Sequence, residues 1–110
     1  LLGGVEGIGF KQAMQGLESV RIQTGALAVG LAQSALDQAM GHATRREQFN
    51  APIVGFPRIA DKIAMMATEI AIARQLTYFA ARKKDSGERA DMQAAMAKLL
   101  AAHRPPTPPT

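Results

Sequence analysis

The hydrophobic positions between residues 11 and 43 recur every three or four residues, which is the period of an α-helix. The same stretch has no proline, and it is rich in Ala, Leu, Gln and Met, which lose little rotamer freedom in a helix. We therefore predict one long helix from Phe10 to Arg46, about 55 Å in length at the helical rise. The positions that carry the pattern are Met14, Leu17, Leu27, Leu31, Ala35 and Ala39.

A second helix is predicted after a turn at residues 50–56, where Pro52 bars helix continuation. Pro57 is tolerated at a first helical position, and Gly87 is predicted to cap the helix beyond its last turn at Lys84. Spacings of four and three residues along this segment predict a seam that faces another helix. The seam consists of Ile59, Ile63, Met66, Ile70, Ala73, Thr77 and Ala80.

A third, shorter helix is predicted over residues 89–102. Its larger apolar residues share one side of the helix. That side comprises Met92, Ala95, Met96, Leu99 and Leu100. In the first helix, Gly25, Ala28, Ala32 and Ala35 form a stripe of small residues, which predicts close approach of another backbone.

These elements predict an all-α fold, an up-down helical bundle with three helices. The composition agrees, since 47% of residues are hydrophobic and only 5% aromatic, which favours interdigitating helices over a β-sandwich. We expect residues 1–9 to be a linker from a missing upstream domain, residues 10–103 the bundle and residues 104–110 a disordered Pro-rich tail. Three helices leave apolar surface exposed, so either the chain oligomerises or a fourth helix is missing.

Charge and composition limit the classes of function that this chain can have. The formal net charge is +4, but the basic residues are scattered and no aromatic residues interleave with them, which disfavours nucleic acid as a partner. There is no Cys, which is consistent with a cytoplasmic protein and excludes a thiolate metal site. His42 and His103 have no metal-ligand spacing, so no metal is expected, and no uncharged run is long enough for a membrane span.

The best candidate for ligand chemistry is the end of the first helix. Arg46 can hold phosphate oxygens with its guanidinium fork, and Phe49 offers a face for a planar heterocycle beside Gln48. Compensation of the helix dipole is the alternative explanation for this basic end. Earlier in the helix, Glu18 and Arg21 are three residues apart, so they share a side and can pair at the surface or point into a cleft.

Several segments, in matching order and spacing, resemble the acyl-CoA dehydrogenases of fatty acid metabolism. They are LLG at 1–3, GIGF at 7–10, LESVRI at 17–22, AVGLAQSALD at 28–37, REQFNAPI at 46–53, ADKIA at 60–64, ARQLTY at 73–78 and AAMAK at 94–98. The resemblance implies the truncated C-terminal helical domain of an FAD-dependent oxidoreductase that oxidises an acyl-CoA thioester at Cα–Cβ. It further implies a homo-oligomer, a dimer or tetramer, that passes electrons to an electron-transferring flavoprotein.

The resemblance assigns roles to particular residues. It places Arg46 at the FAD pyrophosphate of a neighbouring subunit with Gln48 and Phe49 beside the cofactor, and it places Glu18 and Arg21 at the acyl-CoA pocket.

The sequence also departs from the family pattern. Pro57 stands where the family has a flavin-contacting Gln, and Asn50 replaces the Gly that usually follows Phe49. Val20 occupies the position where some members carry the catalytic base, and the Gln-x-x-Gly-Gly segment of the family is absent. The resemblance therefore gives no catalytic residue in this chain, which we expect to be inactive alone. The alternative function is a non-catalytic helical oligomerisation or scaffold module that has lost flavin binding.

Overall fold

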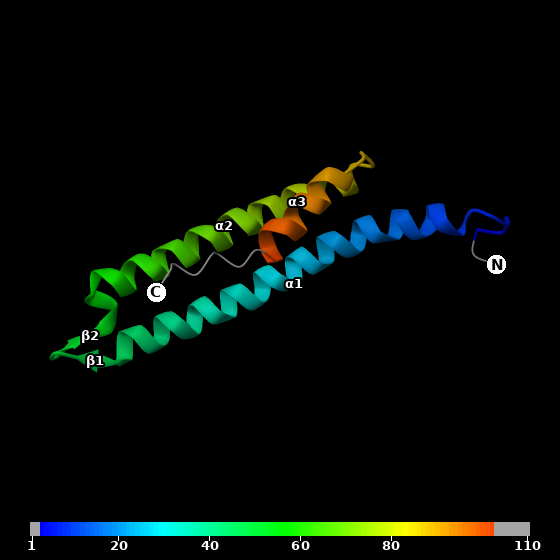
Figure 1. Ribbon diagram of the computed structural model, residues 1–110. Coiled ribbons are helices and arrows are strands. Elements are labelled where there is room, and N and C mark those ends of the chain that lie inside the picture. Colours follow the sequence, from blue (N-terminus) through cyan, green and yellow to red (C-terminus); the bar gives the residue numbers. More distant parts are fainter. Residues whose placement is uncertain (1–2, 103–110) are drawn as a thin grey trace, which may run out of the picture.

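The structure is a computed structural model that describes residues 3–102. Two long helices, α1 (Gly9–Arg45) and α2 (Pro57–Asp85), lie antiparallel, and the short helix α3 (Asp91–Ala102) packs against both (Figure 1). Strands β1 (Glu47–Gln48) and β2 (Ala51–Pro52) and the 3-10 helix η1 (Ile53–Gly55) join α1 to α2. The predicted all-α bundle of three helices is confirmed.

The ends of α2 follow from its sequence. Pro57 occupies the start of the helix, where its missing N–H would have no helical partner in any case. At the other end, Gly87 has φ +79°, and its N–H donates to the Lys84 carbonyl at 3.1 Å. Arg82, Lys83 and Lys84 fill the last turn, where positive charge is favourable to the helix dipole. The sequence predicted both ends to within one residue.

The core is narrow and consists mainly of small side chains. Val29 of α1 packs with Ile70 and Ala73 of α2, and the predicted seam of α2 lies on this buried side. At the point where all three helices meet, a Cβ on Gly25 would lie 3.4 Å from the Thr77 hydroxyl and 3.6 Å from the Ala97 backbone. The predicted close approach is therefore present at Gly25, whereas Ala35 at the other end of that stripe is exposed.

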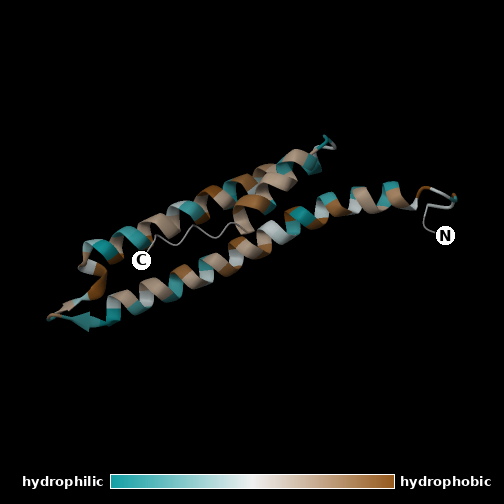
Figure 2. Cartoon of the chain, viewed as in Figure 1, coloured by the Kyte–Doolittle hydropathy of each residue, from teal (hydrophilic) through white to brown (hydrophobic). Residues whose placement is uncertain are grey.

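The apolar side of α3 is mostly exposed, and a side of smaller residues faces the bundle. Met92, Met96 and Leu99 are exposed, and Ala95 is also exposed. The buried residues are Ala90, Ala94 and Ala97, with Leu100 partly buried. The backbone of α3 comes so close to α1 that only small side chains fit between them, so the larger residues face outward. Figure 2 shows α3 as predominantly hydrophobic, which agrees with an apolar outer side.

The molecule is elongated. Its principal extents are 71 × 29 × 22 Å and its radius of gyration is 19.4 Å, against about 13 Å for a compact domain of this length. The N-terminal end of α1 projects beyond α2 and α3 (Figure 1). Phe10, Met14 and Leu17 in the N-terminal part of α1 are exposed, as are Leu27 and Leu31 further along. Within residues 3–102, no large side chain is fully buried, so the chain leaves much apolar surface for other contacts.

Candidate functional site

The hairpin that follows α1 positions the residues predicted to bind a cofactor. The sequence predicted only a turn over residues 50–56, but β1 and β2 pair antiparallel, with Gln48 opposite Ala51. Two residues therefore make the loop, Phe49 with φ 51° and Asn50 with φ 62°. Positive φ at both central positions is typical of a tight type I′ hairpin turn. Asn tolerates this conformation, whereas Phe is a strained residue there.

Two hydrogen bonds hold the backbone of Arg46 in place. Its N–H donates to the His42 carbonyl at 2.9 Å, and its carbonyl accepts from the Ile53 N–H at 2.8 Å. Its side chain is exposed, and within residues 3–102 its guanidinium makes no ion pair. The arginine is therefore held at a defined place while its forked donors stay available to an anion.

The aromatic residue of the hairpin is also presented outward. Phe49 is 90% exposed, and its ring meets the Phe56 ring edge-on, with centroids 6.1 Å apart. Gln48 is exposed on β1, which Figure 2 shows as hydrophilic. The structure thus places Arg46 directly before a short hairpin that carries Gln48 and Phe49.

A cavity of about 700 Å³ lies beside the hairpin, between α1, η1 and α2. Its lining is mainly apolar, with Ala39, Ala43, Ile53, Ile59, Ile63 and Met66. His42, Arg58 and Lys62 add basic groups to the same cavity. Sequence reasoning did not identify this cavity, because its residues come from three separate segments. Arg58 and Lys62, together with Arg46, place positive charge at this end of the bundle, next to the acidic Glu47 of β1.

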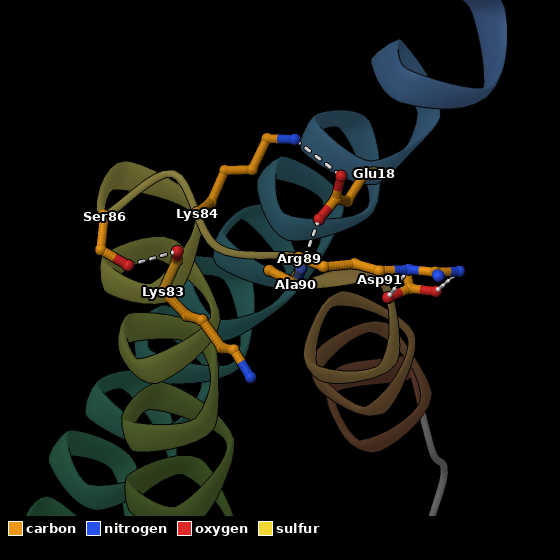
Figure 3. A network of polar contacts seen from close by, with 7 residues as sticks. All are labelled: Glu18, Lys83, Lys84, Ser86, Arg89, Ala90 and Asp91. Carbon is orange, nitrogen blue, oxygen red and sulfur yellow. Dashed lines mark hydrogen bonds and ion pairs between the residues drawn. The ribbon is translucent and has the colours of Figure 1, made fainter. Parts of the chain in front are cut away.

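Glu18 lies in a different environment from the one expected. Both of its oxygens are engaged: Oε2 accepts from Lys84 Nζ at 2.6 Å, and Oε1 accepts from the Ala90 N–H at 2.8 Å (Figure 3). The Lys84 hydrogen bond is the main cause that lowers the pKa of Glu18 below its ordinary value. The ion-pair partner of Glu18 is therefore Lys84 of α2, not Arg21.

Arg21 is partly buried on α1, and within residues 3–102 it makes no ion pair. Near Glu18, Arg89 donates to both Asp91 oxygens, at 3.0 and 2.9 Å, which lowers the pKa of Asp91 and raises that of Arg89. The local charges around α3 are thus paired with one another. Arg21 remains able to meet an anionic group from outside the described chain.

Two further expectations concern absences. In the described part of the chain, no group of three or more His, Asp or Glu residues could hold a metal ion. None of the helices in residues 3–102 is both long and apolar enough to cross a membrane. His103 and the Pro-rich tail predicted at residues 104–110 lie outside the described residues.

The fold is a three-helix bundle in which Arg46 and a short hairpin join α1 to the rest of the chain at one end. Residues 7–104 match the family model described as acyl-CoA dehydrogenase, C-terminal domain. The chain therefore belongs to the acyl-CoA dehydrogenase family, and it corresponds to the C-terminal domain.

Individual relatives agree with this assignment. The chain is 60% identical over 102 residues to (2S)-methylsuccinyl-CoA dehydrogenase of Cereibacter sphaeroides, covering 93% of this chain and 19% of the relative. It is 44% identical over 99 residues to the mitochondrial short-chain specific acyl-CoA dehydrogenase of Bos taurus, covering 90% and 24%. Butyryl-CoA dehydrogenase from Megasphaera elsdenii superimposes with a TM-score of 0.87 at 43% identity, covering 89% and 26%. The chain spans about a quarter or less of these relatives.

Proposed function

We propose that this chain is the C-terminal domain of an FAD-dependent oxidoreductase that dehydrogenates an acyl-CoA thioester at Cα–Cβ. The observation that carries the proposal is the hairpin after α1. It holds the Arg46 backbone by hydrogen bonds on both sides and keeps Phe49 exposed at positive φ. Backbone strain at a non-glycine residue often accompanies a functional site, and here Arg46 makes no ion pair within residues 3–102 while Phe49 contacts the chain at the edge of Phe56 but stays 90% exposed.

The residues of the hairpin fit the chemistry of FAD. Arg46 would bind the pyrophosphate of a flavin that belongs to a neighbouring subunit, because its fork matches phosphate oxygens. Gln48 supplies amide donors and Phe49 an aromatic face beside it. When bound, FAD supplies the hydride acceptor of the reaction. Pro57 offers the cofactor no hydrogen-bond donor. Arg46 would therefore contribute a larger share of FAD binding than it would in a chain with a donor at position 57.

Arg21 and Glu18 are proposed to serve the acyl-CoA pocket in different ways. Arg21 would meet an anionic part of the substrate, since no described side chain neutralises it. The Glu18 carboxylate would act mainly by holding its segment of α1 against Lys84 and the start of α3. Val20 cannot act as a base, so the proton-abstracting carboxylate is proposed to lie outside this chain.

The relatives suggest a substrate class. The proteins with 60% and 44% identity are named for methylsuccinyl-CoA and for short acyl chains. We therefore propose a short acyl-CoA, with methylsuccinyl-CoA, which carries a free carboxylate besides its thioester, as the first candidate. Electron-transferring flavoprotein is the proposed acceptor of the electrons. Self-association is required, because Arg46 would reach the cofactor of another subunit.

The test uses a flavoprotein that contains this domain in its natural context. Its visible absorption spectrum is recorded before and after addition of methylsuccinyl-CoA, butyryl-CoA and a long-chain acyl-CoA. Bleaching of the flavin bands by a short acyl-CoA supports the proposal and selects the substrate. Arg46→Ala should weaken FAD binding at least tenfold, since a charge-assisted hydrogen bond contributes about 1.5–3 kcal/mol. Arg45→Ala is the matched control, because Arg45 is the neighbouring arginine and ends α1.

A non-catalytic scaffold is the second candidate, and Pro57 favours it because α2 begins with a residue that has no donor for a cofactor. A protein that binds no flavin even after FAD is supplied would support the scaffold. Equal FAD affinity of the wild type and Arg46→Ala would also contradict the proposed role of the hairpin.

A further inference from the structure

Two opposite charges on the same side of α1 do not pair with each other. Glu18 and Arg21 are three residues apart, so they differ by about 60° around the helix and by about 4.5 Å along its axis. This spacing allows an ion pair within one helix. Within residues 3–102, however, Glu18 forms its ion pair with Lys84, and Arg21 has none. The contact that the local sequence allows is thus replaced by one between two helices.

The environment of Glu18 explains why its carboxylate takes a cation. Its side chain is only 14% exposed, and a carboxylate so far removed from water is costly unless positive charge and hydrogen bonds compensate it. Lys84 Nζ donates to Oε2 at 2.6 Å, and the Ala90 N–H donates to Oε1 at 2.8 Å (Figure 3). Both oxygens are therefore engaged by groups other than Arg21.

Two more acidic residues lie close to Ala90 in the sequence, and each has a basic partner of its own. The ion pairs of this junction are Glu18 with Lys84, Glu88 with Lys83 and Asp91 with Arg89. Arg21 is partly buried, so water compensates its charge only in part. Its forked donors are therefore available to a carboxylate from outside the described chain.

We propose that Lys84 is a positioning residue for the substrate site, because it holds the Glu18 carboxylate and so keeps Arg21 available for the free carboxylate of a short acyl-CoA such as methylsuccinyl-CoA. This role rests on the proposed function and adds to it the residue that decides the preference for a carboxylated substrate. Lys84 acts through Glu18 and needs no contact with the substrate. Without Lys84, Glu18 Oε2 loses its cation, and Arg21 is the nearest replacement along the same helix. The new pair would then compete with the substrate carboxylate.

The test compares two acyl-CoAs that differ in charge. The flavoprotein that contains this domain is titrated with methylsuccinyl-CoA, which has a free carboxylate, and with butyryl-CoA, which has none, and the concentration that half-reduces the flavin is measured. Lys84→Met should raise the ratio of the first concentration to the second about tenfold, the factor expected for loss of one hydrogen bond to a charged group. Lys84→Arg retains a cation and should keep the ratio of the wild type. Lys83→Met is the matched control, because Lys83 is the adjacent lysine, lies 4.0 Å from Glu88 and points away from Glu18 (Figure 3).

A second substitution distinguishes this role from a purely structural one. If Lys84→Met acts through the released Glu18 carboxylate, the double variant Lys84→Met, Glu18→Gln should return the ratio to within about twofold of the wild type. Lost packing would not be repaired by a second change at the same contact. In an Arg21→Met protein, Lys84→Met should leave the ratio unchanged, because the group that Lys84 protects is absent. Circular dichroism of each variant verifies that the helices are retained.

The change of partner can also be observed in the 110-residue chain without flavin or substrate. The Arg21 Nε–H resonance is assigned by its loss in Arg21→Lys. It should shift in Lys84→Met, where Arg21 pairs with Glu18, and stay in place in Lys83→Met. A resonance that does not move in Lys84→Met would overturn the inference.

The outcomes of the titration separate the role of Lys84 from the proposed function. Wild-type flavin that no acyl-CoA reduces would overturn the proposed function and this role together. Flavin that is reduced by butyryl-CoA but not by methylsuccinyl-CoA would leave the dehydrogenation intact and overturn the assignment of Arg21 to a carboxylate. If Lys84→Met raises both concentrations by the same factor, or neither, the positioning role of Lys84 alone is overturned.

Discussion

Replacement of Glu18 by Ala would remove the contact that joins all three helices. Glu18 belongs to α1, its partner Lys84 to the last turn of α2, and its second partner Ala90 to the residue just before α3 (Figure 3). The two interactions differ in environment. The Lys84 side chain is 35% exposed, whereas Ala90 is completely buried. The expected destabilisation therefore comes mainly from the backbone N–H of Ala90.

The magnitude follows from these environments. A buried N–H that loses its acceptor costs about 1–3 kcal/mol. An ion pair with a partly exposed Lys contributes at most about 1 kcal/mol after solvent screening. Glu18→Ala is thus expected to lower the free energy of unfolding by about 2–3 kcal/mol in total, which corresponds to a fall in Tm of about 10–20 °C for a chain of this size. Glu18→Gln should lose less, because it keeps an acceptor for Ala90.

Urea-induced unfolding, followed by circular dichroism at low chain concentration, measures this loss. Lys84→Met removes only the ion pair and should cost less than about 1 kcal/mol. Glu88→Ala is the control, since Glu88 is 67% exposed and lies 4.0 Å from Lys83. If Glu18→Ala destabilises the chain no more than Glu88→Ala, the carboxylate does not hold the start of α3, and the reasoning is refuted.

Three further predictions concern pH, glycines and the hairpin. Folding lowers the pKa of Glu18 below 4.5. The Glu18 carboxylate therefore stabilises the fold above that pH, and this stabilisation is lost as the pH falls through the folded pKa. The difference in unfolding free energy between wild type and Glu18→Gln should shrink when urea titrations are done in acid. Gly16→Ala should raise Tm, with a gain of about 0.5–1 kcal/mol, because a Cβ there meets no neighbour within 4 Å, whereas Gly25→Leu should lower it by overpacking against Thr77. Phe49→Gly should stabilise the chain by about 1 kcal/mol in urea unfolding, since it relieves a positive φ, yet weaken FAD binding in the longer protein.

The two long helices could be predicted because their sequences contain strong local signals. The three-and-four spacing of apolar residues marks the inner sides, while Pro57 and Gly87 mark the ends of α2. The predicted ends of α1 at Phe10 and Arg46 differ by one residue from those observed. Local propensity and tertiary packing favour the same conformation in these segments, so sequence reasoning is sufficient there.

The inner face of α3 could not be predicted in this way. A sequence pattern ranks Met and Leu above Ala as core residues, because they bury more apolar area. Close approach to α1 at Gly25 reverses this order, since only the thin side with Ala94 and Ala97 fits there. The distance between two helices depends on residues far apart in the sequence, so it is not contained in the period of either helix.

In the candidate site, too, some features could be predicted from local sequence and others could not. The two-residue strands have no alternation long enough to detect, so the hairpin was predicted only as a turn. Arg46 and Phe49 were identified by residue type, and their roles came from the family resemblance. Lys84 as the partner of Glu18 could not be found, because the two residues are 66 positions apart.

The polar groups of the chain fall into two sets with different consequences. Glu18 is satisfied within the chain, and Arg74 of α2 donates to Gln33 of α1 at 2.6 Å, so these groups fix the helices relative to one another. Arg21 and Arg46 have no ion-pair partner among residues 3–102, although the backbone around Arg46 is well fixed. Because the backbone is already fixed and the charge is unpaired, less conformational entropy is lost when an anion binds there. Substitutions in the first set should therefore change stability, whereas Arg46→Ala should leave the unfolding transition unchanged and alter only ligand binding.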